Sequence, residues 1–84
     1  MLYQIFTDLG AKAKVANALR KKGFKVWAGF FWLERTLFLD CEPQQLELAK
    51  SIVGIFDIFP SPIEKADLEL WESLVLEVSK AKLQ

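Results

Sequence analysis

The stretch from Phe24 to Trp32, FKVWAGFFW, constrains the fold most, because it holds five of the eleven aromatic side chains of this 84-residue chain. Side chains alternate between the two faces of a strand. Phe24 and Phe30 would therefore point to one face, and Trp27 and Phe31 to the other. A sheet that packs helices on one face needs a cover for its second face, which could be another helix, a second subunit or single-stranded nucleic acid.

The order of the local patterns predicts the fold class. Strand patterns cover residues 2–7, residue 24 to a hairpin at 32–35, and residues 36–41 and 55–59. Helical patterns cover residues 11–22 and 43–53, and a third helix should run from a capping box at 61–64 to near residue 82. We expect an α+β protein, a ferredoxin-like βαββαβ sandwich with a four-stranded antiparallel sheet, strands one and three central, and an additional C-terminal helix. Residues 1–84 should form a single domain, with the βαββαβ core in 1–60 and the amphipathic helix in 61–84.

Four local expectations follow from single residues. Asp8 should cap the first helix, and Gly23 should follow its end. Pro62 should be the first residue of the third helix. The second helix should end at Gly54. Its buried stripe should consist of Leu46, Ala49, Ile52, Val53 and Phe56.

The C-terminal helix is apolar over about 200° of its circumference, twice the usual stripe of roughly 100°. This pattern predicts contacts on two sides, one with the chain's own sheet and one with a second subunit or another protein. We therefore expect a homodimer and a protein partner. The expected partner or dimer interface comprises Trp27, Phe31, Leu68, Trp71, Val75, Leu76 and Leu83.

The net charge is zero, but its distribution is uneven. Residues 1–42 carry seven basic and four acidic side chains, and residues 43–84 carry four basic and seven acidic ones. A basic cluster could bind phosphates, which makes nucleic-acid binding the alternative function. The possible contacts are Lys12, Lys14, Arg20, Lys21, Lys22 and Lys25.

Catalytic chemistry has little support in the sequence. The chain has no histidine and a single cysteine, Cys41, which the strand pattern places in the core. Asp8 and Asp40 should lie apart, with Asp8 near Arg35 and Asp40 near Met1. We expect no catalytic residues, no cofactor and no metal. The lone cysteine, the lack of a secretory leader and the lack of a long apolar run favour a cytoplasmic protein without a membrane partner.

The run from Lys14 to Val26, KVANALRKKGFKV, resembles the first helix and the start of the second strand of the Cas2 family. These are small, dimeric ferredoxin-like proteins with an aspartate after strand one, where this chain has Asp8. The serine-phenylalanine pair that usually follows strand two is missing here. The resemblance implies a metal-dependent nuclease as a third possibility. The first expectation remains a small non-catalytic regulatory or adaptor protein that acts by protein–protein interaction.

Overall fold

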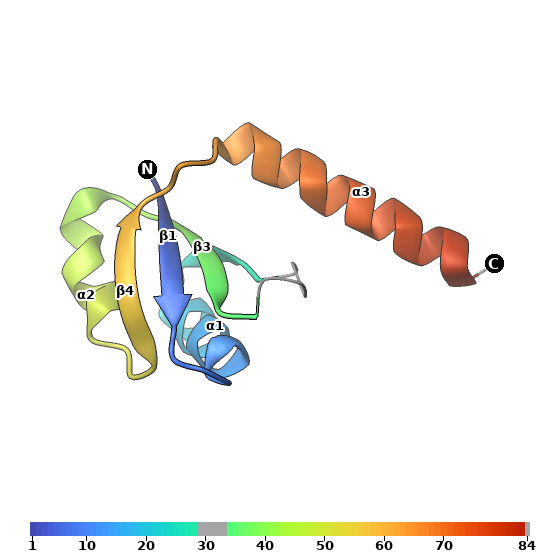
Figure 1. Ribbon diagram of the computed structural model, residues 1–84. Helices are drawn as coiled ribbons and strands as arrows, with labels where there is room; N and C mark the ends of the chain where they lie inside the picture. Colours follow the sequence, from blue (N-terminus) through green and yellow to red (C-terminus); the bar gives the residue numbers. More distant parts are fainter. Residues whose placement is uncertain (29–33, 84) are drawn as a thin grey trace.

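The computed structural model describes residues 1–28 and 34–83, with side chains described only as far as residue 74. It shows an antiparallel sheet of four strands, β1 (Leu2–Thr7), β2 (Lys25–Trp27), β3 (Thr36–Asp40) and β4 (Ile55–Pro60) (Figure 1). The three helices are α1 (Lys12–Lys21), α2 (Leu46–Lys50) and α3 (Lys65–Leu83). The strand order is β2-β3-β1-β4. The predicted α+β class, the antiparallel sheet and the central position of β1 and β3 are confirmed.

Strand β1 fixes the register of the sheet because it pairs with both β3 and β4. Ile5 lies opposite Leu37 on one side and Ile58 on the other. The pairing with β4 shifts between Phe6, which lies opposite Asp57, and Thr7, which lies opposite Ile55. Phe56 is therefore the extra residue of a bulge, and its ring is left exposed.

One face of the sheet carries the main hydrophobic core under α1 and α2. The core includes Ile5, Leu37 and Leu39 from the strands and Val15 and Leu19 from α1, all fully buried. Cys41 also lies in this core, as predicted. Strand β3 is buried on both faces, since Phe38 faces the other side and is also buried. The second face of the sheet is therefore covered at β3.

The second helix is shorter than predicted. A 3-10 turn over Pro43–Gln45 precedes α2. In this turn the Gln45 side chain accepts a hydrogen bond from the Glu42 amide at 3.0 Å. The helix ends at Lys50, so the Val53 side chain is 80% exposed instead of lying in a buried stripe. Phe56 belongs to β4, because Gly54 turns the chain into that strand with a φ of 105°.

Two predicted caps are wrong. The cap of α1 is Ala11, whose amide donates to the Asp8 carbonyl, while the Asp8 side chain is exposed. The Ser61 hydroxyl bonds to the amide and carbonyl of Ile63 in a tight turn, so α3 begins only at Lys65 and Pro62 stays outside it. Gly23 does follow the end of α1, with a φ of 90°.

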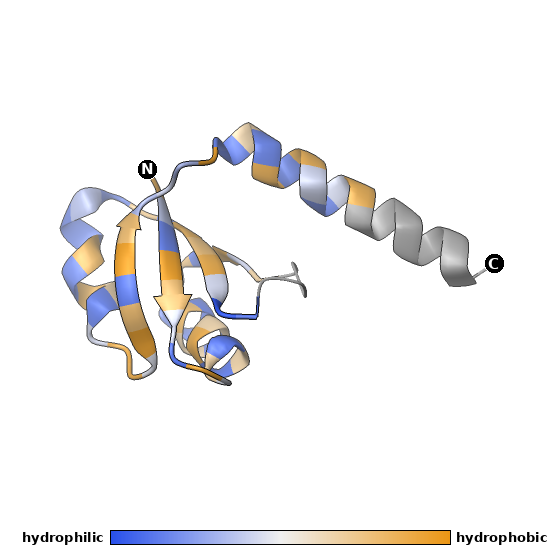
Figure 2. Ribbon diagram, viewed as in Figure 1, coloured by the Kyte–Doolittle hydropathy of each residue, from blue (hydrophilic) through white to orange (hydrophobic). Residues whose placement is uncertain are grey.

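Helix α3 leaves the end of β4 and projects beyond the sheet toward the C-terminus (Figure 1). The molecule is accordingly elongated, with principal extents of 43 × 26 × 22 Å. Apolar and polar residues alternate around the described part of the helix (Figure 2). Within the described residues, no helix is both long enough and apolar enough to cross a membrane.

Candidate interaction surface

The N-terminal part of α3, around Leu68, packs on the second face of the sheet. Leu68 is 1% exposed and forms a small hydrophobic cluster with Trp27 on β2 and Phe38 on β3. Leu2 on β1 packs against the same cluster. The aromatic pattern of β2 predicts a cover for Trp27, and the structure supplies one from the chain's own third helix. Leu68, expected at a partner interface, instead lies in the interior of its own chain.

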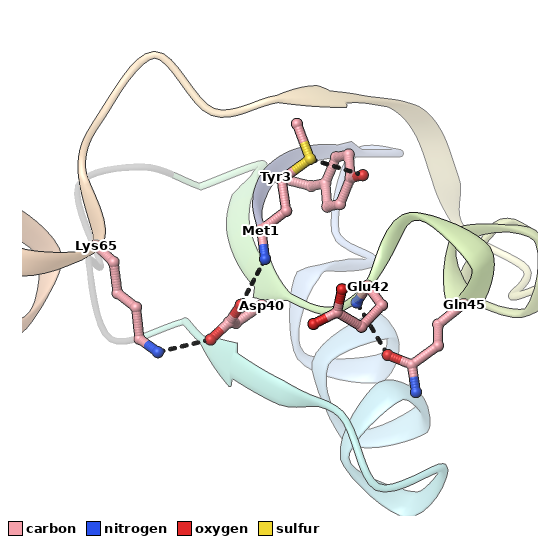
Figure 3. Close-up of polar contacts among 6 residues, drawn as sticks. All are labelled: Met1, Tyr3, Asp40, Glu42, Gln45 and Lys65. Atoms are coloured by element: carbon pink, nitrogen blue, oxygen red, sulfur yellow. Dashed lines mark hydrogen bonds and ion pairs between the residues drawn. The ribbon is translucent and has the colours of Figure 1, made fainter.

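Asp40 forms two ion pairs, and the one with Lys65 joins α3 to the sheet (Figure 3). The Asp40 carboxylate accepts a hydrogen bond from the Lys65 ammonium at 2.7 Å and lies 3.3 Å from the N-terminal amine of Met1. The Lys65 hydrogen bond is the main reason why the pKa of Asp40 is lowered, and the same bond raises the pKa of Lys65. The neighbourhood of Asp40 and Met1 is as predicted, and Lys65 adds a contact that the sequence pattern does not reveal.

After Leu68, α3 presents an exposed apolar stripe, which we define as Leu70, Trp71 and Leu74. Their side chains are 59%, 51% and 47% exposed. At 100° per residue the three positions fall within an arc of about 100°, and Leu70 and Leu74 lie on the side of the helix away from Leu68. Large side chains gathered in this way are typical of a protein-binding surface.

A second apolar patch, which we call the aromatic face, lies on β1 and β4 and consists of Phe6, Phe56 and Phe59. Phe56 is 68% and Phe59 is 37% exposed, while Phe6 is half-buried. The Phe6 and Phe56 rings meet edge to face with their centroids 6.0 Å apart. The Arg35 guanidinium lies 4.3 Å from the Phe6 centroid, and its Nε donates to the Thr7 carbonyl at 2.8 Å.

The sequence pattern misses the aromatic face for two reasons. It assigns Phe56 both to the stripe of the second helix and to the strand at 55–59, and it cannot show that α3 meets the sheet at Trp27, Phe38 and Leu2 alone among the described residues. The register does reveal the patch once it is known, because Phe59 lies opposite Gln4 and shares the face of Phe6.

The other residues expected at the interface fall into two groups. Trp71 belongs to the exposed stripe, whereas Trp27 is buried. Phe31 lies outside the described residues, as do the side chains of Val75, Leu76 and Leu83.

The basic residues expected to contact nucleic acid lie on α1 and around β2. Lys14, Arg20, Lys21, Lys22 and Lys25 are exposed. Lys25 also lies over the Trp27 ring at 4.8 Å and 4.0 Å from the Glu69 carboxylate.

A pocket of about 340 Å³ on α1 brings part of the basic set together. Its polar lining consists of Lys12, Asn17 and Arg20, and three alanines complete it. Arg20 also donates to the Val26 carbonyl at 3.3 Å. Partial burial lowers the pKa of Lys12.

The structure assembles no catalytic constellation among the residues it describes. It contains no group of three or more acidic or cysteine side chains that could hold a metal ion in the described part of the chain. Burial raises the pKa of the Cys41 thiol, which lowers its reactivity. Asp8 and Asp40 lie at different ends of β1 and β3, consistent with the predicted separation.

Comparisons with known proteins add no assignment. No family model, no curated protein and no solved structure matches this chain. Inference about function therefore rests on the surfaces described above.

Proposed function

We propose that this protein is a small non-catalytic regulatory or adaptor module that acts by binding other protein chains, and that it is a homodimer. The observation that carries the proposal is the exposed stripe of Leu70, Trp71 and Leu74 on a projecting helix. We further propose a ferredoxin-like class for the fold, which the strand order and the antiparallel pairing support. A cytoplasmic location is part of the same proposal, supported by the lone, buried cysteine.

The burial of the stripe supplies the driving force. Full burial of a leucine-sized side chain contributes roughly 1.5–3 kcal/mol. Helix α3 leaves Leu70 and Leu74 about half exposed, so much of this free energy remains to be gained in a complex. A partner that covers both residues on each of two chains would gain several kcal/mol, which is enough to offset part of the entropy lost on association.

The direct test of this surface is a change of oligomeric mass. Leu74→Glu places a charge in the middle of the stripe, and we expect it to shift the mass measured by light scattering from dimer to monomer. Gln44→Glu is the control, because it adds the same charge at an exposed position outside α3. Equal masses for the two variants would contradict the assignment of the stripe. A pull-down with immobilised protein then tests for a different partner chain, whose capture should also fail with Leu74→Glu.

The pocket on α1 favours one second candidate function, nucleic-acid binding. Lys12, Asn17 and Arg20 could hold a phosphate there, with Lys21 and Lys22 close by in the sequence. Each phosphate contact lowers the slope of log affinity against log salt by about 0.7 for a single strand. We would measure binding of a fluorescent single-stranded oligonucleotide at several salt concentrations. Loss of binding in Arg20→Glu but not in Lys50→Glu would favour this candidate over protein binding.

A further inference from the structure

The charges along α3 are segregated between its two ends. Residues 64–73 carry four carboxylates and one lysine, whereas residues 74–84 carry two lysines and one carboxylate. The helix is therefore acidic over its first half and basic near its end. Two copies side by side bring like charges together if they run parallel, and opposite charges together if they run antiparallel.

The same segregation holds along the line of the stripe itself. Asp67 precedes Trp71 by four residues and Leu74 by seven, which puts it in line with both at the N-terminal end. In the sequence, Lys82 follows Trp71 by eleven residues, or about three turns, which gives it the same line at the C-terminal end. On the line of Trp71, an acid thus precedes the stripe and a base follows it, while Glu77 lies one turn beyond Leu74 on the line of Leu70.

The charge pattern bears on which chain covers the stripe. We infer that α3 pairs with α3 of a second copy in an antiparallel arrangement about a two-fold axis near Leu74. Asp67 of each copy then lies near Lys82 of the other, and the two apolar stripes face one another. Because each α3 is anchored to its own sheet at its N-terminal end, through Leu68 and Lys65, the two sheets lie at opposite ends of the helix pair.

The two-fold arrangement also leaves the aromatic face free. Phe6, Phe56 and Phe59 lie on β1 and β4, away from the stripe, so the dimer displays two copies of this patch. The inference rests on the proposed function, since it names the chain that covers the stripe.

Charge reversal distinguishes the two orientations. In an antiparallel dimer, Asp67→Lys or Lys82→Asp alone turns two attractive contacts into repulsive ones, and we expect the dissociation constant of the dimer to rise by about tenfold. The double variant Asp67→Lys with Lys82→Asp restores opposite charges, and its dissociation constant should return to that of the unmodified chain. In a parallel dimer none of the three variants changes the sign of a contact between the chains. Analytical ultracentrifugation measures all four constants.

Distances between spin labels give an independent readout. With Cys41→Ala as background, a label at residue 66 should lie about 25 Å from its copy in the antiparallel dimer, from 1.5 Å per residue over sixteen residues, but about 10 Å away in a parallel one. A label at residue 73, near the two-fold axis, should give a short distance in both. Circular dichroism confirms that each variant is folded.

The outcomes test the antiparallel orientation and the pairing with a second copy separately. Rescue in the double variant with a long distance at residue 66 supports antiparallel pairing. A dimer that ignores all three charge variants, or a short distance at residue 66, overturns the antiparallel pairing and leaves the proposed binding function standing. A chain that is monomeric at every concentration overturns the inference of a second copy, and the pull-down with Leu74→Glu then decides whether a different protein uses the stripe.

Discussion

Leu68 is the residue whose replacement should most clearly separate the role of α3 in folding from its proposed role in binding. Its side chain is 1% exposed between Trp27 and Phe38, and it is the only described side chain of α3 that is buried. Leu68→Ala removes three carbon atoms from this cluster. Such changes cost about 2–5 kcal/mol, and less where the surroundings can collapse into the space. The cluster is small and lies under a single helix that can move inward, so we expect about 2 kcal/mol.

The assay is thermal unfolding followed by circular dichroism and by tryptophan fluorescence. For a domain of this size each kcal/mol lowers the midpoint by about 4–8 °C, so Leu68→Ala should lower it by roughly 8–16 °C. Leu70→Ala is the matched control, because it removes the same atoms two residues along the helix, where the leucine side chain is 59% exposed. We expect a change of at most about 0.5 kcal/mol there, measured at a concentration low enough to avoid association. Equal shifts for the two variants would refute the packing of α3 on the sheet.

Three further predictions follow from single contacts. Lys65 holds the pKa of Asp40 below its usual value, so this carboxylate stabilises the fold above about pH 4, and the contribution is lost as pH falls through the lowered pKa. Asp40→Asn should remove that part of the loss of stability at low pH. An unchanged dependence of stability on pH below about pH 4 would contradict this prediction. Gly54→Ala should destabilise the fold by about 1–3 kcal/mol, because φ is 105° and the new Cβ would lie 2.8 Å from a Val15 methyl carbon; a neutral change in denaturant unfolding would contradict it. The protein should not cleave nucleic acid with Mg²⁺ or Mn²⁺ present, and cleavage that is lost in Asp8→Asn would refute the non-catalytic proposal.

A control for Gly54 is available in the same chain. Gly10 also has a positive φ, 78°, but an added Cβ there meets nothing within 4 Å. Gly10→Ala should therefore show only the cost of the backbone conformation, about 1 kcal/mol. The difference between the two variants isolates the steric contact with α1.

The strand pattern predicted the sheet well because burial on one face imposes a period of two residues. Strand β1 matches its predicted range, and β3 and β4 each differ by one residue. Strand β2 is shorter than predicted, since it covers only Lys25–Trp27, and residues 29–33 of its predicted range lie outside the described residues. The second helix was predicted poorly, because the apolar residues Val53 and Phe56 fit a helical stripe as well as they fit the turn and bulge in which they lie. The period of a short apolar run does not distinguish these possibilities.

The candidate site was harder to predict than the fold, and the reason is physical. The sequence shows that α3 has more apolar surface than one contact needs, but it does not show how far along the sheet the helix stays in contact. The structure places that limit near Leu68, after which Leu70 and Leu74 are exposed. Interactions that decide this limit, such as the ion pair of Lys65 with Asp40, join residues 25 positions apart, so no local pattern reveals them.

The way α3 is attached to the sheet is consistent with its proposed role in binding. A helix that lay flat along the sheet would bury its own stripe and cover the aromatic face, and both surfaces would be lost. The bond from Lys65 to Asp40 and the packing of Leu68 hold only the first turns, so the rest of the helix extends from the sheet with its stripe accessible. Weakening this anchor should therefore affect stability and association differently. Asp40→Asn should lower stability more than it lowers the affinity of the dimer, because the stripe itself is unchanged, whereas Leu74→Glu should do the reverse.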